Sequence, residues 1–124
     1  MNKILISNLK VHFLRKDTEG YVSFSNINLK ILKILYLEGL IRGFKKENNN
    51  RIKVFLKYYN GNCLINKMKY INVKRNNKFY FLTLKKIKRF FGLKNKIILS
   101  TNAGLLTNRH CIFWGTGGRM LLII

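Results

Sequence analysis

Two short segments near the end of the chain combine hydroxyl, amide and glycine residues at spacings that suit close contact with a ligand. Residues 100–104 read Ser-Thr-Asn-Ala-Gly, and residues 115–118 read Gly-Thr-Gly-Gly. Glycine lets a backbone approach its partner closely, and short hydroxyls and amides form hydrogen bonds without bulk. The two segments are therefore suited to forming hydrogen bonds with a ligand at close range.

Each segment also has a purely structural explanation. Ser100 or Thr101 would cap a helix beginning at Leu105, or the glycine run would form a strained hairpin turn. The run is not a nucleotide P-loop, because the Gly-Lys-Ser/Thr ending is missing, nor a dinucleotide site, because Arg119 onward reads as a strand. For the glycine run, backbone approach to RNA and a hairpin turn remain open alternatives.

Charge restricts what the chain binds. It carries 25 Lys and Arg against 4 Asp and Glu, a formal net charge of +21 over 124 residues. A polyanion would relieve the resulting self-repulsion, which makes nucleic acid the leading partner. An anionic membrane surface would require a basic amphipathic helix or a polybasic block, whereas these lysines are spread over the whole chain. The longest uncharged run, residues 97–108, is too short to span a bilayer.

Catalysis and metal binding find little support. The carboxylates are Asp17, Glu19, Glu38 and Glu47. None is paired at a spacing suited to general acid and base work, and His12 and His110 fall in different predicted units. Cys63 and Cys111 have no partner motif, so we expect neither a disulfide framework nor a tetrahedral metal site, but a buried thiol beside a surface imidazole at 110–111. We therefore expect no enzyme, cofactor or metal.

The hydrophobic pattern predicts an α+β fold in two small units, residues 1–62 and 63–124, joined near residues 60–67. In the first unit we expect a helix over 4–14, a strand over 21–24, a second helix capped by Ser25 and ended by Gly39, and a hairpin with one buried face. The hairpin covers residues 40–58 with a turn at 48–50.

The second unit is predicted to be richer in strands. The Asn60-Gly61 turn leads into a strand reaching Val73, and a short strand follows over 79–82. Thr83 is expected to cap a helix that ends at Gly92, after which two strands complete the chain. The whole chain is expected to hold about three helices and seven strands.

The amino-acid composition indicates the type of genome that encodes the chain. Lys, Asn, Ile, Leu and Phe are abundant, and proline is absent from all 124 positions. Most of the abundant residues have codons rich in A and T, whereas proline codons begin with CC. This composition predicts an AT-rich genome, for which a small organellar genome is a natural source.

Several motifs, in order along nearly the whole chain, resemble one known family. They are Ser25 through Phe44 with Glu38-Gly39-Leu40-Ile41, then Leu56-Lys57-Tyr58-Tyr59-Asn60-Gly61, then residues 100–104, Thr107-Asn108-Arg109 and residues 115–118. Together they resemble the small-subunit ribosomal protein eight of bacteria and organelles. The chain departs from the family pattern at four positions. Where this chain has Asn102, Ala103, Asn108 and Arg119, the family usually has Ser, Lys or a similar polar residue, Asp and Glu, respectively.

The resemblance implies binding to the central domain of small-subunit ribosomal RNA, beside neighbouring small-subunit proteins and without membrane insertion or a small-molecule substrate. The C-terminal unit would bind an irregular stem and the N-terminal unit a second RNA segment. Together with the amino-acid composition, the resemblance implies a ribosome of the mitochondrial matrix, or alternatively of a plastid. The competing hypothesis is another basic organellar nucleic-acid-binding or packaging protein, which would also bind duplex DNA.

The candidate RNA-binding residues are hydroxyl, amide, glycine and basic positions. They are Ser100, Thr101, Asn102, Gly104, Thr107, Asn108, Arg109, Gly115, Gly117, Gly118, Arg119, Lys10, Ser25, Lys85, Lys86 and Lys88. Aromatic side chains also stack on bases, but alternation along the strands assigns most of them to the core. Trp114, beside the glycine run, is the expected exception.

Overall fold

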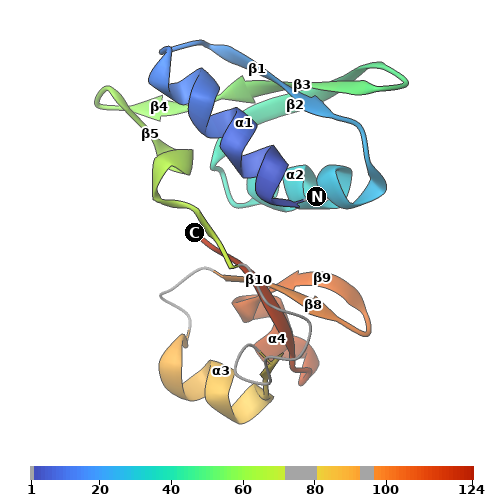
Figure 1. Cartoon of the computed structure of the whole chain (residues 1–124). Coiled ribbons are helices and arrows are strands. Elements are labelled where there is room, and N and C mark those ends of the chain that lie inside the picture. Colours follow the sequence, from blue (N-terminus) through green and yellow to red (C-terminus); the bar gives the residue numbers. More distant parts are fainter. Residues whose placement is uncertain (1, 72–80, 93–96) are drawn as a thin grey trace. The chain divides into compact units, whose positions relative to one another are not determined.

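The computed structural model describes residues 2–71, 81–92 and 97–124, and the chain divides into two compact units, residues 1–67 and 68–124 (Figure 1). The boundary lies after Lys67, whereas the sequence analysis placed it after Asn62. Both units combine helices with antiparallel sheets, which confirms the predicted α+β class. None of the helices in the described ranges has the length and apolar composition needed to cross a membrane.

The first unit pairs two helices with a three-stranded sheet. Its elements are α1 (Asn2–Leu14), β1 (Glu19–Ser23), α2 (Asn26–Leu37), β2 (Ile41–Asn48), β3 (Arg51–Leu56), β4 (Tyr58–Tyr59), β5 (Asn62–Cys63) and the 3-10 helix η1 (Leu64–Lys67). The sheet order is β1-β3-β2, and β4 pairs with β5. Ile52, Val54 and Leu56 of β3 are buried in alternation with less buried residues, which confirms the predicted hairpin with one buried face.

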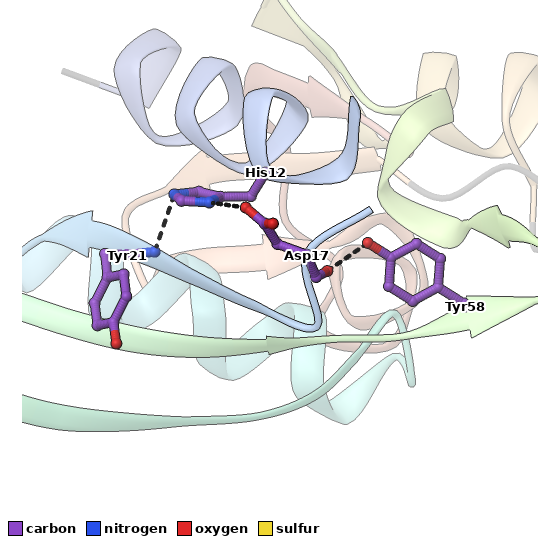
Figure 2. A network of polar contacts seen from close by, with 4 residues as sticks. All are labelled: His12, Asp17, Tyr21 and Tyr58. Atoms are coloured by element: carbon purple, nitrogen blue, oxygen red, sulfur yellow. Dashed lines mark hydrogen bonds and ion pairs between the residues drawn. The ribbon is translucent and has the colours of Figure 1, made fainter. Parts of the chain in front are cut away.

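His12 joins the end of α1 to the following turn and to β1 (Figure 2). Its Nε2 accepts a hydrogen bond from the Tyr21 N–H at 3.4 Å, so a proton on Nδ1 donates to Asp17 Oδ2 at 2.9 Å. The Tyr58 hydroxyl donates to the Asp17 carbonyl at 2.5 Å. A Cβ at Gly20 would lie 3.1 Å from the His12 ring, so the ring and strand approach closely. This histidine and this carboxylate therefore hold the helix against the sheet.

The second helix begins and ends as its sequence predicts. Ser25 Oγ accepts a hydrogen bond from the Asn28 N–H at 3.1 Å, and the Asn28 side-chain amide donates to the Ser23 carbonyl at 2.9 Å. Gly39 follows the helix with a left-handed φ of 72°. The Ser25 hydroxyl thus satisfies a free N–H at the start of the helix.

The second unit is an antiparallel sheet with two short helices. Its elements are β6 (Lys69–Tyr70), β7 (Phe81–Leu82), α3 (Leu84–Phe90), β8 (Ile97–Thr101), β9 (Gly104–Thr107), α4 (Asn108–Trp114) and β10 (Gly118–Ile123). β10 pairs with β8 along one edge and with β6 and β7 along the other, and β9 lies beyond β8. Ile87 of α3, Cys111 of α4, and Leu82, Ile97 and Leu99 of the strands form the core.

Two predictions about residues 63–124 are wrong. The described residues contain four α-helices and ten strands, and α4 was not expected. Only Asn108 and Cys111 of its seven residues are buried, so it has no repeating apolar stripe to reveal it. The strand expected after Asn60-Gly61 is interrupted by η1. Thr83 is the N-cap residue of α3, as expected, but its side chain makes no capping hydrogen bond. Val73 and Phe79, which belong to two of the predicted strands, lie outside the described residues.

We predict that Ser25→Ala lowers the free energy of unfolding by about 1 kcal/mol, because an N–H at the start of α2 loses its acceptor. Chemical denaturation followed by circular dichroism measures this change. Ser23→Ala is the matched control: Ser23 is exposed and its carbonyl is retained, so we expect a change within about 0.5 kcal/mol. Equal stabilities of the two variants would contradict the capping role.

Candidate nucleic-acid interface

The hairpin of β8 and β9 carries the Ser-Thr-Asn-Ala-Gly segment at its end. Thr101 Oγ1 donates to the Gly104 carbonyl at 2.9 Å and accepts from the Ala103 N–H at 3.2 Å, while Gly104 has a φ of 106°. Thr101 therefore shapes the turn, whereas Ser100 and Asn102 are exposed. A strand rather than a helix follows the turn, so the helix-cap explanation of Ser100 and Thr101 is wrong.

The glycine run ends a helix and then packs backbone against backbone. Gly115, with a φ of 68°, ends α4, and its N–H donates to the Cys111 carbonyl. A Cβ at Gly117 would lie 2.5 Å from the Leu82 carbonyl oxygen, and one at Gly118 would overlap the Ser100 carbonyl oxygen. The hairpin-turn explanation is therefore wrong, since these glycines bring β10 against the main chain at β7 and β8.

This packing places Arg119 beside the hairpin. Arg119 pairs with Ser100 of β8 on one side and with Phe81 of β7 on the other. Residues directly opposite in antiparallel strands have Cβ atoms about 5 Å apart on the same face, and all three of these side chains are exposed. The arrangement puts a guanidinium, a hydroxyl and an aromatic ring side by side. Phe81 lies in a strand that was predicted, but it was missed as a site residue because the aromatic side chains of the strands were assigned to the core.

Asn108 is fully buried and has an internal role. Its Oδ1 accepts from the Ile97 N–H at 3.4 Å, and its Nδ2 donates to the Gly92 carbonyl at 2.7 Å. The amide therefore joins the end of α3 to the start of β8. An ionised aspartate at this position would have no proton to donate to Gly92.

Of the two residues beside Asn108, one is buried and the other is exposed. Thr107 is buried, with its Oγ1 2.7 Å from His110 Nδ1, whereas Arg109 is exposed. On α3, the side chains of Lys85, Lys86 and Lys88 are exposed and Ile87 is buried. The basic residues of both helices are therefore accessible to a ligand.

Two candidate residues belong to the first unit. Lys10 is half-buried on α1, and the Ser25 hydroxyl is used as the cap of α2. The structure therefore assigns Ser25 an internal hydrogen bond.

Charge is divided unequally between the units. Residues 68–124 contain twelve Lys and Arg and no Asp or Glu, whereas residues 1–67 contain thirteen basic and all four acidic side chains. Within the first unit, Asp17 contacts His12, and Glu19 Oε2 lies 2.6 Å from Lys53 Nζ. The second unit has no carboxylate side chain to offset its charge, which favours binding to a polyanion.

The cysteines are buried and unpaired. Burial raises the pKa of both the Cys63 and the Cys111 thiol above its ordinary value. Beside Cys111, His110 is exposed, which confirms the predicted buried thiol next to a surface imidazole. Among the residues that the structure describes, no three His, Cys, Asp or Glu side chains are grouped to hold a metal ion.

The chain is similar throughout to one family. The family model for ribosomal protein S8 matches residues 5–124. The small ribosomal subunit protein uS8m of Acanthamoeba castellanii is 30% identical over 122 residues, covering 97% of this chain and 94% of the relative. The uS8c protein of Phaseolus vulgaris is 32% identical and covers 100% of the chain and 99% of the relative, and the uS8 protein of Anaplasma phagocytophilum is 33% identical with 82% and 78% covered.

We predict that Gly118→Ala lowers the free energy of unfolding by about 3 kcal/mol, because the added methyl group overlaps main-chain atoms of β8. Urea denaturation monitored by circular dichroism measures the loss. Gly43→Ala is the control, since its Cβ would meet only the Phe55 ring at 3.8 Å and its φ is not left-handed. A Gly118→Ala variant as stable as Gly43→Ala would disprove the close packing.

Proposed function

This chain belongs to the ribosomal protein S8 family, and from that membership we propose that it is a structural constituent of the small ribosomal subunit. In this role it binds the central domain of the small-subunit ribosomal RNA and supports its assembly for translation. The observation that carries the proposal is the extent of the match, residues 5–124, which includes both units. The family consists of structural proteins, in agreement with the expectation that the chain is not an enzyme.

The second unit offers two kinds of RNA contact. Proteins recognise structured RNA through its shape, its phosphates and its 2′-hydroxyl groups across a wide minor groove. At the hairpin end, Ser100 and Asn102 are exposed and small enough to bond ribose and base edges. Arg119, beside Ser100, and the lysines of α3 supply cations for phosphates. We therefore assign the specific recognition of the cognate RNA to the hairpin, and the general electrostatic attraction of RNA phosphates to the basic side chains.

The first unit would bind a second RNA segment and neighbouring small-subunit proteins. Its formal charge is +9, with Lys10 as a candidate contact on α1. Two of its carboxylates are engaged within the unit, by His12 and by Lys53, so they do not face RNA as isolated negative charges. Ser25 would act through the stability of α2 rather than through its hydroxyl.

We propose a mitochondrial ribosome as the site of action, with a plastid ribosome as the alternative. The similar proteins include the mitochondrial uS8m of Acanthamoeba castellanii, the chloroplast uS8c of Phaseolus vulgaris and a bacterial uS8. An AT-rich organellar genome accounts for the abundance of Lys, Asn, Ile and Phe and for the absence of proline.

The division between recognition and attraction predicts different responses to mutation. Ser100→Ala should weaken binding to a transcript of the central domain by about 1 to 3 kcal/mol, if its RNA partner is left buried and unpaired, and should barely change binding to random RNA. Replacing Lys85, Lys86 and Lys88 by Gln should weaken binding to both RNAs. It should also make the plot of the logarithm of the binding constant against the logarithm of the salt concentration less steep. We expect the slope to fall by roughly 0.7 to 0.9 for each phosphate that the variant no longer neutralises. Filter binding at several salt concentrations measures both effects.

The same charge change in the first unit is the control. Lys30, Lys45 and Lys46 are exposed there, and replacing them by Gln should affect a stem bound by the second unit less than the α3 variant does. Equal losses of affinity for cognate and random RNA in Ser100→Ala would remove the hairpin as the recognition element. Wild-type protein that bound duplex DNA as tightly as the central domain would contradict the ribosomal function.

A further inference from the structure

The outward face of α4 consists of aromatic and basic side chains. Asn108 and Cys111 are fully buried, whereas Arg109 and His110 are exposed, Phe113 is 85% exposed and Trp114 is 64% exposed. Exposing two large neighbouring rings to water in this way is unfavourable unless something covers them. The exposure of Trp114 was predicted from the sequence, whereas that of Phe113 was not, because the helix α4 was not predicted.

The geometry of the helix pairs each ring with a nitrogen-bearing side chain. Residues four apart are neighbours on a helix surface, which places Arg109 beside Phe113 and His110 beside Trp114. The two rings meet edge to face, with centroids 6.2 Å apart and an interplanar angle of 81°. In this arrangement the two ring planes point in different directions, so they can receive two flat groups rather than one.

The helix that carries these rings is held at both ends. Its first residue, Asn108, is bonded to the Ile97 N–H and the Gly92 carbonyl, and Gly115 ends it in the left-handed conformation. Between them, Cys111 is packed in the core. The exposed rings therefore stand on a fixed support, which reduces the entropic cost of stacking a ligand on them.

We propose that Phe113 and Trp114 form a stacking site for unpaired bases of ribosomal RNA, with Arg109 bonding the adjoining phosphate; this rests on the proposed function. Charge complementarity selects RNA as the occupant, because the unit that carries this face has twelve basic and no acidic side chains. Aromatic rings accept any base, since every base has a π face, and a neighbouring guanidinium adds attraction to the backbone.

Trp114 provides its own probe, because it is the single tryptophan of the chain. Wild-type protein is mixed with an in vitro transcript of the central domain of the small-subunit ribosomal RNA from the same genome. Stacking should quench the Trp114 emission and reduce its collisional quenching by neutral acrylamide several-fold. Random RNA of equal length at the same saturation serves as the comparison and should protect Trp114 less.

Variants test the contribution of the rings to affinity. Trp114→Leu and Phe113→Leu should each weaken binding to the central domain about tenfold without changing the salt slope, because no charge is removed. Trp114→Tyr, which keeps a ring, should retain most of the affinity. Tyr59→Leu is the matched control, since Tyr59 is 69% exposed on β4 of the first unit, and it should bind as wild type does.

The outcomes separate this inference from the ribosomal function. If wild-type protein binds the central domain but Trp114 stays accessible and the Leu variants bind normally, the stacking site is disproved while the function stands. If Trp114 is shielded only after other small-subunit proteins are added, the face binds protein and the inference is wrong. If wild-type protein shows no preference for the central domain, both the function and the stacking site are overturned.

Discussion

The backbone contact at Gly117 and Gly118 is the constraint on which the surface of the second unit depends. Main-chain atoms of Leu82 and Ser100 lie where a side chain at either glycine would stand. Main-chain atoms cannot turn aside as the end of a flexible side chain can, so only glycine permits this register of β7, β10 and β8. The same register sets Arg119 between an exposed hydroxyl and an exposed ring. Two residues without side chains thus determine which side chains face the solvent together.

Charge decides what that surface does. The first unit engages Asp17 and Glu19 with basic side chains, but residues 68–124 have no carboxylate to offset their twelve basic groups. A ligand that binds the folded state and neutralises these groups stabilises that state by mass action. We therefore expect stability and RNA binding to be linked more strongly in the second unit than in the first.

Sequence patterns predicted the parts of the fold that repeat over several turns or strand pairs. Helices α1 and α2, the β2–β3 hairpin and the Ser25 cap follow from local periodicity and capping chemistry. The helix α4 was not predicted, because only Asn108 and Cys111 of its seven residues are buried and they form no repeating apolar pattern. Residue types marked residues 100–104 as a candidate site, but they did not show that this segment ends a β-hairpin. They also did not show that Thr101 turns inward or that Asn108 bonds to the distant Gly92, since both depend on tertiary contacts.

Directed cleavage of RNA tests the central claim, that the second unit binds the central domain through the β8–β9 hairpin. Both natural thiols are buried with a raised pKa, so they react poorly with a thiol-reactive reagent. An iron chelate that carries such a reagent therefore attaches to the cysteine of an Ala103→Cys variant, at the exposed end of the hairpin. With small-subunit ribosomal RNA we predict cleavage confined to one irregular stem of the central domain, and at a different place from a chelate on Asn49→Cys of the first unit. Cleavage spread evenly along the RNA, or absent from the central domain, would contradict the account.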